Sequence, residues 1–332
     1  MAKGNCVNID MIRAAATRLA GRVRQTPLLS SPFLDEIAGR PLWVKAECLQ
    51  HTGSFKYRGG LAAVSSLSDQ ARAQGVVAFS SGNHAQGVAL AARQYGAPAV
   101  IIMPKDAPAI KIANTRALGA EVVLYDRWSE DRDAIGAALA QDRGLTLIKP
   151  FDEPEVIAGQ GTTGLEIAAQ ADALGITGAE VLVCCGGGGL SSGIALALAA
   201  DAPDFRVRPV EPQGYDDVTR SLAAGRILHN ENPPPSICDA IVTPQPGKLT
   251  FPILRRLCGP GHVVSDEEAM RAMVLAFSRL KIVLEPGGAV ALAAALFRAP
   301  PNAGTPVIAV ATGGNIDPAL FIHALNLYGD DG

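Results

Sequence analysis

Short apolar runs alternate with longer segments of helical spacing along almost the whole chain. The runs are apolar throughout, as strands are in a sheet that is buried on both faces. The segments between them are rich in Ala, Leu, Arg and Glu, for example residues 84–96. This alternation predicts an α/β protein with parallel sheets. The predicted strands are residues 41–47, 75–81, 98–104, 120–126, 145–150, 179–186, 205–212 and 305–314.

Length, charge and cysteine usage restrict the class of protein. A chain of 332 residues suggests about two domains. The net charge of −3 and the lack of a basic block argue against nucleic acid or an anionic membrane as partner. The six cysteines show no metal-ligand spacing, so we expect free thiols. Residues 1–20 carry no apolar signal segment and no apolar run is long enough for a membrane span, so we predict a cytoplasmic protein.

Glycine-rich turns follow several of the predicted strands or open predicted helices. They are residues 80–84, 185–193, 285–290 and 311–315. In open α/β sheets, ligands bind at the carboxyl ends of the strands. We therefore expect the turns to face one cleft. The one long interruption, residues 229–247, is rich in proline and predicted to be irregular.

Gly186 to Gly189 form the strongest signal for an anion. Consecutive glycines let the backbone approach a ligand and turn its N–H groups inward. The following segment is predicted to be a helix, whose N-terminus favours negative charge. A phosphate would fit there. A dinucleotide site is the second interpretation, because such sites have an acidic residue about 20 positions further on that binds the ribose, and Glu211 lies near that distance. A tight turn that binds no ligand is the third interpretation.

Two further turns contain polar groups whose interpretation stays open. Residues 80–84 place hydroxyls, an amide and an imidazole at a strand–helix junction, where Ser81 or Asn83 is an equally good plain N-cap. Residues 211–217 contain Glu211, Asp216 and Asp217, whose oxygens suit Mg²⁺, Mn²⁺ or Ca²⁺. A solvated acidic loop explains that pattern as well. No hydrolase triad is indicated around His84.

Lys56 is a single lysine with glycines on both sides and Phe55 directly before it. An exposed lysine that only packs its stem on the surface needs no such surroundings. Pyridoxal phosphate is held through its phosphate and through a covalent link to lysine. A phosphate turn together with this lysine therefore indicates pyridoxal phosphate. The amine must become neutral to react, which burial and nearby positive charge favour.

Motifs spread over nearly the whole chain resemble one enzyme family. They are QTPLL (25–29), TGSFKYRG (52–59), SSGNHAQG (80–87), VIAGQGT (156–162), GGGGL (186–190), VEP (210–212), EPGGAV (285–290) and TGGNID (312–317). In this order they resemble the threonine dehydratase and serine racemase group of pyridoxal-phosphate enzymes, fold type II, like the β subunit of tryptophan synthase. The resemblance implies two open, twisted parallel-sheet domains with the cofactor in the cleft between them. Residues 1–69 and 150–332 would form the large domain, residues 70–149 a small mobile domain, and the protein a homodimer.

The resemblance also implies roles for the cofactor residues. Lys56 would bind the cofactor covalently and then act as the base at Cα of the substrate. Phe55 would pack on the ring, Asn83 would bind its phenolic oxygen, and Thr312 would sit at the pyridine nitrogen. Glu285 would line the cofactor pocket. The phosphate would be wrapped by Gly186, Gly187, Gly188, Gly189 and Leu190.

Further matches concern substrate and metal. Ser81 would serve the substrate face opposite Lys56, and Arg132 aligns with a substrate-contacting arginine. The metal ligands implied are Glu211, the Tyr215 carbonyl and Asp217, with Mg²⁺, Mn²⁺ or Ca²⁺ as the ion. The substrate carboxylate would be held by Ser80, Ser81, Gly82, Asn83 and His84.

The resemblance implies an ammonia-lyase that dehydrates a β-hydroxy-L-amino acid such as threonine or serine. 3-Hydroxyaspartate is an alternative, because residues 125–133 resemble members that act on this acid and Arg132 could pair with its extra carboxylate. Serine racemisation is another, given Ser81. A non-catalytic sensor and a nicotinamide-dependent oxidoreductase are alternatives of other classes. Cys48, Gly60 and Ala240 depart from the family pattern; the methyl group of Ala240, where a glycine is usual, would narrow the pocket.

Overall fold

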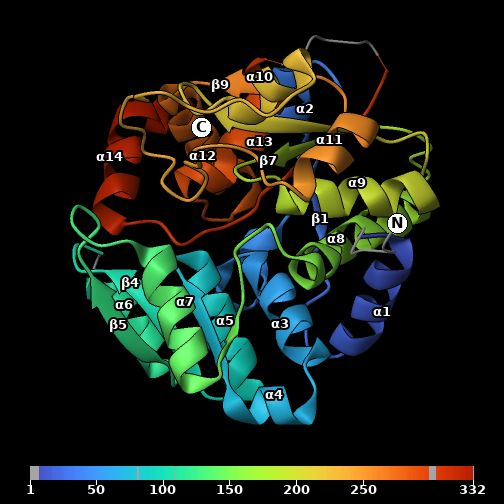
Figure 1. Ribbon diagram of the computed structural model, residues 1–332. Coiled ribbons are helices and arrows are strands. Elements are labelled where there is room, and N and C mark those ends of the chain that lie inside the picture. The colour runs from blue at the N-terminus through green and yellow to red at the C-terminus, as the bar shows by residue number, and fades with distance from the viewer. Residues whose placement is uncertain (1–6, 81, 108, 299–303, 332) are drawn as a thin grey trace.

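The structure, a computed structural model, describes residues 7–80, 82–107, 109–298 and 304–331. It contains a six-stranded sheet of order β1-β2-β10-β7-β8-β9 and a four-stranded sheet of order β5-β4-β3-β6. Figure 1 shows the four-stranded sheet at the lower left and the six-stranded sheet above it. The strands of the small sheet all lie between residues 76 and 147, so the chain enters and leaves this part once.

The six-stranded sheet is parallel except at one edge. There β1 runs antiparallel to β2. At the centre, Val307 of β10 lies opposite both Leu42 of β2 and Glu180 of β7. The strands are β1 (Leu28–Ser30), β2 (Leu42–Lys45), β7 (Glu180–Cys184), β8 (Arg206–Pro212), β9 (His262–Val264) and β10 (Val307–Val310).

The four-stranded sheet is parallel throughout. Its strands are β3 (Val76–Phe79), β4 (Ala99–Pro104), β5 (Glu121–Tyr125) and β6 (Thr146–Leu147). All eight strands predicted from the apolar runs are confirmed, somewhat shorter than expected. The prediction missed β1 and β9, which have three residues each and are too short to show a pattern.

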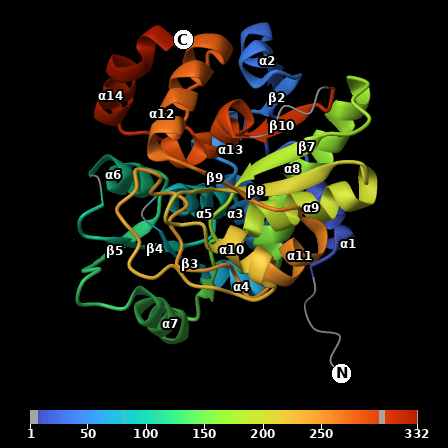
Figure 2. The same ribbon diagram turned by 90° about the horizontal axis from the view of Figure 1, so that it is seen from above.

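Helices cover both faces of the large sheet, and this explains its apolar strands. Leu182 and Ala309 face a cluster formed with α2, α12 and α13, whereas Val181 and Ile308 face α8 and α9. Figure 2 shows the two helix layers on either side of β7 and β10. The helices involved are α2 (Pro32–Ala38), α8 (Pro154–Ala173), α9 (Gly189–Asp201), α12 (Asp266–Leu275) and α13 (Pro286–Phe297).

One apolar core joins the small sheet to the rest of the molecule. It runs from β3 and β4 through α5 and α3 to α8. The other face of the small sheet packs on α7. The remaining helices are α1 (Ile9–Leu19), α3 (Lys56–Ser66), α4 (Asp69–Gln74), α5 (Asn83–Gln94), α6 (Ala109–Ala117), α7 (Arg132–Arg143), α10 (Asp217–Ala224), α11 (Thr250–Leu257) and α14 (Pro318–Tyr328), with the short turns η1 (Glu47–Leu49), η2 (His51–Gly53), η3 (Ala276–Leu280) and η4 (Gly329–Asp331).

Three further features concern the irregular segment, the cysteines and the length of the apolar helices. Residues 229–247 contain neither helix nor strand, as predicted. In the described part of the chain, Cys48, Cys184, Cys185, Cys238 and Cys258 are free thiols. No helix formed by the described residues is both long and apolar enough to cross a membrane.

Candidate active site

Lys56 begins α3 directly after a tightly turned segment. Thr52 and Gly53 have φ values of 61° and 72°, in the left-handed region that favours glycine. Ser54 forms an isolated bridge with Gly313, and the Phe55 N–H donates to the Thr312 carbonyl at 3.1 Å. The turn before Lys56 is therefore fixed to the turn that follows β10.

The Lys56 amine lies in a partly buried position between two segments. It donates a hydrogen bond to the Pro150 carbonyl at 2.8 Å and lies 5.1 Å from the centre of the Phe55 ring. Burial lowers the pKa of Lys56 to about 8, and the carboxyl of Glu285 offsets part of this shift. A lowered pKa makes the neutral, nucleophilic amine accessible close to neutral pH.

The glycine turn lies next to the segment that binds Lys56. A Cβ on Gly187 would come within 2.3 Å of the Phe151 ring, so only glycine fits beneath this ring. Phe151 directly follows Pro150, which accepts the hydrogen bond of Lys56. Gly188 has a φ of 89° and precedes α9, whose start has no side-chain cap among the described residues. The uncapped N–H groups of α9 are thus open to an anion.

Two buried polar side chains without partners flank this turn. Gln160 is fully buried, and neither its amide nitrogen nor its oxygen has a hydrogen-bond partner in the described structure. Its Oε1 would lie 2.8 Å from a Cβ on Gly189. On the other side, the Thr243 hydroxyl is also unpaired, and its methyl group would lie 3.2 Å from a Cβ on Gly186. Because buried polar groups are nearly always paired, this site fits a phosphate, and with Lys56 it fits pyridoxal phosphate.

Asn83, Glu285 and Asn315 form a hydrogen-bonded cluster between the two sheets. The Asn83 Nδ2 donates to Glu285 Oε1 at 2.5 Å, and Asn315 Nδ2 donates to Asn83 Oδ1 at 2.7 Å. Burial raises the pKa of Glu285 to about 7. The Glu285 N–H donates to the Gly313 carbonyl. The turns 80–84, 285–290 and 311–315 therefore meet beside Lys56, and the place where they meet is called the cleft below.

Thr312 and His84 lie close to Lys56 and carry no charge at neutral pH. Thr312 is buried, and its carbonyl accepts from Phe55. His84 is buried with its Nε2 3.1 Å from the Ile148 carbonyl. Burial and the nearby Lys56 lower the pKa of His84 to about 3. His84 is thus a neutral imidazole here.

Ser81 and Arg132 were both predicted to contact the substrate. Ser81 lies outside the described residues, whereas its neighbour Ser80 accepts a hydrogen bond from the Gly82 N–H at 3.1 Å. The Arg132 guanidinium lies 5.2 Å from the centre of the Phe79 ring and 3.8 Å from the carboxylate of Asp133, and half of its side chain is exposed. Both substrate roles stay predictions.

The predicted metal ligands come together only in part. Glu211 accepts hydrogen bonds from the backbone N–H groups of Val218 and Thr219, so its carboxylate caps α10. Asp217 accepts one from Asn230, and its other oxygen is buried without a partner in the described structure. Burial and mutual repulsion raise the pKa of Glu211 to about 8, and burial raises that of Asp217 to about 7. In the described part of the chain, no three His, Cys, Asp or Glu side chains are grouped as metal ligands.

The structure shows the surroundings of the three departures from the family pattern. A Cβ on Gly60 would come within 3.0 Å of the backbone of Gly87, so α3 and α5 cross very closely there. The methyl group of Ala240 would lie 3.2 Å from a Cβ on Gly287, so it borders the turn 285–290. Cys48 is buried, and its N–H donates to the Ala311 carbonyl.

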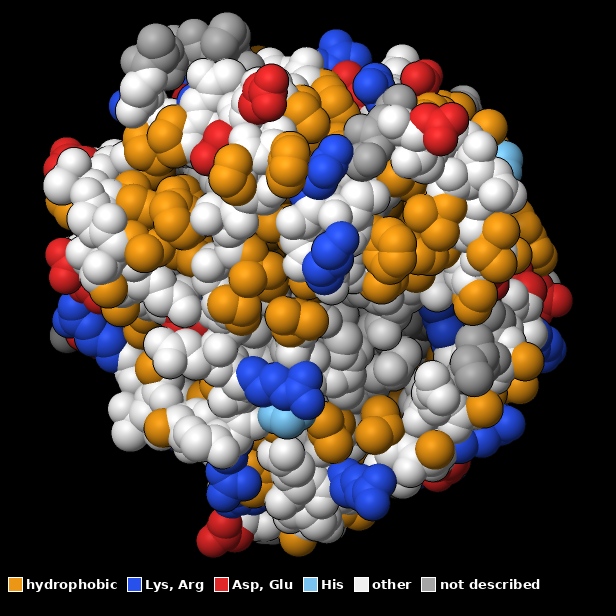
Figure 3. Space-filling model, turned by 180° about the vertical axis from the view of Figure 1, so that it is seen from behind, with side chains coloured by type: hydrophobic (Ala, Val, Ile, Leu, Met, Phe, Trp, Pro, Cys, Tyr) orange, Lys and Arg blue, Asp and Glu red, His pale blue; other side chains and the backbone are white. Residues whose placement is uncertain are grey.

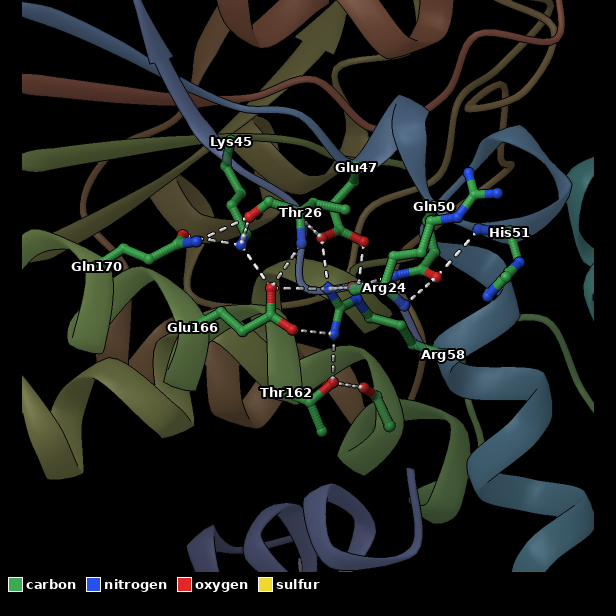
Figure 4. A network of polar contacts seen from close by, with 11 residues as sticks. Arg24, Thr26, Lys45, Glu47, Gln50, His51, Arg58, Thr162, Glu166 and Gln170 are labelled. Atoms are coloured by element: carbon green, nitrogen blue, oxygen red, sulfur yellow. Dashed lines mark hydrogen bonds and ion pairs between the residues drawn. The ribbon is translucent and has the colours of Figure 1, made fainter. Parts of the chain in front are cut away.

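A buried ionic network fixes α3 from behind (Figure 4). Arg58, two residues after Lys56, is fully buried and pairs with Glu47 at 2.8 Å and with Glu166 at 2.7 Å. Lys45 also pairs with Glu166, at 2.6 Å. The network is completed by hydrogen bonds to Thr26, Thr162 and Gln170. It ties α3 to β2 and α8 and so sets the direction of the helix that begins with Lys56.

Sequence reasoning missed several residues of the cleft. Gln160 and Asn315 belong to motifs that were singled out, and Phe151 directly follows a predicted strand, but no pattern showed the direction of these side chains. Lys111 and Asp239 form an ion pair at 3.5 Å although they are 128 positions apart in the sequence. Only the folded chain shows that these two charges meet.

Comparisons with known proteins agree with this geometry. Residues 19–313 match the family model described as pyridoxal-phosphate dependent enzyme. The L-threo-3-hydroxyaspartate ammonia-lyase of a Pseudomonas species is 46% identical over 95% of this chain and 97% of its own length. The structure of maize serine racemase has a TM-score of 0.90 at 36% identity, covering 98% of this chain and 99% of the other.

The crystal structure of a threonine deaminase from T.th. has a TM-score of 0.87 at 46% identity, and the match covers 93% of this chain and 99% of the other. These likenesses confirm the predicted fold class, the type II fold of pyridoxal-phosphate enzymes with its two parallel-sheet units. The family model covers most of the chain, including Lys56, the glycine turn and the residues around Glu285. This protein therefore belongs to the family of pyridoxal-phosphate-dependent enzymes.

Proposed function

We propose that this chain is an ammonia-lyase acting on a β-hydroxy-L-amino acid, from which it forms a 2-oxo acid and ammonia. The observation that carries the proposal is the Lys56 amine, lowered in pKa and adjacent to the glycine turn through Pro150 and Phe151. The names of the similar hydroxyaspartate ammonia-lyase and threonine deaminase support it. Candidate substrates are 3-hydroxyaspartate, threonine and serine.

Each step can be assigned to residues of the cleft. Lys56 would hold the cofactor aldehyde through its amine, and Gly186 to Leu190 would hold the phosphate. When bound, pyridoxal phosphate withdraws electrons from Cα of the substrate. The neutral amine of Lys56 would then serve as the base that takes the proton from Cα of the substrate. The β-hydroxyl then leaves as water, and hydrolysis of the remaining enamine gives the 2-oxo acid and ammonia.

The surrounding residues orient the reactants in this proposal. Phe55 would pack beside the ring, Asn83 would donate to its phenolic oxygen, and Thr312 would place a neutral hydroxyl at the pyridine nitrogen. Glu285 holds Asn83 in place through the hydrogen bond between them. The carboxylate of the substrate is bound by Ser80, Ser81, Gly82, Asn83 and His84. Movement of residues 70–149 over the substrate would exclude water.

Serine racemisation is the second candidate function, favoured by the likeness to maize serine racemase. Racemisation needs a proton donor on the face opposite Lys56, and Ser81 is the proposed donor. Ammonia release does not require a proton donor on that face. The two activities can therefore be separated by their products.

A substrate screen tests the function directly. We expect the protein loaded with pyridoxal phosphate to release a 2-oxo acid from 3-hydroxyaspartate, threonine or serine, as measured by coupled reduction of the oxo acid. D-Serine is measured by chiral chromatography in the same reactions. D-Serine without oxo acid would replace the first function by the second. A bound ligand with neither product would contradict both and indicate a sensor.

A divalent cation beside Glu211 and Asp217 is a further part of the proposal. Carboxylate oxygens are the ligands that Mg²⁺ and Ca²⁺ prefer. Glu211 and Asp217 are two buried carboxylates with raised pKa values, and one oxygen of Asp217 has no partner in the described structure. The Tyr215 carbonyl would complete the site. The ion would stabilise the loop before α10 and supply no group to the reaction.

The stabilisation that a bound cation adds is expected to depend on pH. Without the ion, the folded state holds protons on Glu211 and Asp217 that the unfolded chain has lost, so the free energy of unfolding falls as pH rises from about 4.5 to about 8. Mg²⁺ at about 100 times its dissociation constant should add about 2.7 kcal/mol at pH 8, or roughly 4 °C in the unfolding midpoint. The shift should be smaller at pH 5.5 and absent in Asp217→Asn. An equal shift in that variant would rule out this site.

The assembly and the location of the protein also stay predictions. We infer a homodimer in the cytoplasm from the family resemblance. Light scattering coupled to size-exclusion chromatography measures the first point, with a mass of two chains as the expected value.

A further inference from the structure

Lys111 and Asp239 form an ion pair between the two sheet regions. Lys111 belongs to α6, beside the small sheet, and Asp239 to the irregular segment 229–247. Figure 2 shows this segment reaching from α10 toward α6. The Lys111 side chain is 19% exposed, whereas that of Asp239 is 64% exposed. The Lys111 side chain is thus mostly buried, whereas the Asp239 side chain is largely exposed to solvent.

Lys111 faces the same cleft as Lys56. Its ammonium would lie 4.0 Å from a Cβ on Gly82, in the turn that also contains Asn83. The charges of Lys111, Asp239 and Lys56 all act on the buried carboxyl of Glu285, which binds Asn83. Lys111 is therefore a second cation of the cleft, adjacent to the turn proposed to hold the substrate carboxylate.

The partner of Lys111 is easily displaced. The two charged groups are 3.5 Å apart, which is long for a charge-assisted hydrogen bond, and Asp239 is largely in water. An ion pair with one largely exposed partner contributes little to stability. A carboxylate bound within the cleft would be less screened by water and would pair more strongly with the same ammonium.

We propose that Lys111 binds the second carboxylate of a dicarboxylic substrate, a β-hydroxy-aspartate, and that Asp239 occupies its ammonium until the substrate arrives. This inference rests on the function proposed above. Threonine and serine have no second carboxylate, so Lys111 determines specificity and takes no part in the chemistry. Arg132, the other candidate cation, is 51% exposed and lies over Phe79.

Substrate comparison in matched variants tests the role of Lys111. In Lys111→Met, kcat/KM for 3-hydroxyaspartate should fall about 10- to 100-fold, mostly through KM, because a charge-assisted bond is lost. The value for threonine should stay within about twofold. Lys111→Arg should retain most of the activity toward the dicarboxylic substrate. Lys105→Met is the control, since Lys105 is an exposed lysine of the same region, 3.8 Å from Glu130.

The alternatives give different results. Equal losses for 3-hydroxyaspartate and threonine in Lys111→Met would overturn the proposal in favour of a structural role. An unchanged Lys111→Met together with a selective loss in Arg132→Met would assign the second carboxylate to Arg132. Wild-type turnover of threonine but not of 3-hydroxyaspartate would also overturn it, while leaving the ammonia-lyase function intact.

Binding of an unreactive dicarboxylate keeps the test independent of turnover. 2-Hydroxysuccinate should raise the unfolding midpoint of the cofactor-loaded wild type more than 3-hydroxybutyrate does, and this difference should vanish in Lys111→Met. A difference that persists in the variant would contradict the role of Lys111. If no amino acid of the panel were converted but this difference were seen, the proposed reaction would fail and the carboxylate site would stand.

Figure 3 shows the face of the molecule opposite to that of Figure 1, where lysine and arginine side chains are scattered among apolar ones. The basic side chains on this face form no continuous patch. Scattered surface cations of this kind do not form an anion site on this face.

Discussion

Replacing Lys56 with alanine is expected to lower kcat/KM by at least about 10⁴-fold. A positioned general base alone is worth about 10²–10⁴ in rate, and the variant also loses the covalent link to the cofactor. The visible absorbance band of the cofactor–lysine link should disappear as well. Steady-state release of 2-oxo acid and an absorbance spectrum of the purified variant measure the two effects.

Lys149→Ala is the matched control for this substitution. Lys149 directly precedes Pro150, the residue that accepts the hydrogen bond of Lys56, but its own side chain is exposed to solvent. We expect its turnover and spectrum to match the wild type. Circular dichroism of both variants shows whether they are folded. A folded Lys56→Ala protein with wild-type turnover would refute the assignment of the catalytic amine.

Replacing Arg58 with methionine is expected to destabilise the fold by about 3–5 kcal/mol. Arg58 is fully buried and pairs with both Glu47 and Glu166, so its removal leaves the fully buried carboxylate of Glu47 without its ion-pair partner. The loss corresponds to a fall of roughly 4–7 °C in the unfolding midpoint. Thermal unfolding followed by circular dichroism measures it.

Arg13→Met is the control for the buried network. Arg13 also forms an arginine–carboxylate pair, with Asp201 at 2.7 Å, but its side chain is 57% exposed. Such a surface pair is worth about 0–1 kcal/mol. Similar losses in the two variants would show that burial of the Arg58 network is not what stabilises it.

The sequence predicted the sheets well because their strands are buried on both faces. Strands such as β4 and β7 are apolar at almost every position, and this pattern depends only on nearby residues. β1 and β9 were missed because they have three residues each and are defined by their neighbours. The irregular character of residues 229–247 followed from their prolines.

The site could be predicted only where a local signal exists. Lys56, Asn83 and the glycine turn stand in short motifs, and the structure places Lys56 and the turn around Pro150 and Phe151. The Arg58 network and the Lys111–Asp239 pair unite charges from distant segments. No local sequence pattern predicts such ion pairs, because they depend on how the helices pack.

Covalent capture of the cofactor at Lys56 is the most direct test of the central claim. The protein is incubated with pyridoxal phosphate, reduced with borohydride, digested and analysed by mass spectrometry. We expect one reduced phosphopyridoxyl group on the peptide containing Lys56, and none on this peptide when the turn is disrupted by Gly187→Asp. An unmodified Lys56, or an adduct confined to other lysines, would contradict the proposed active site.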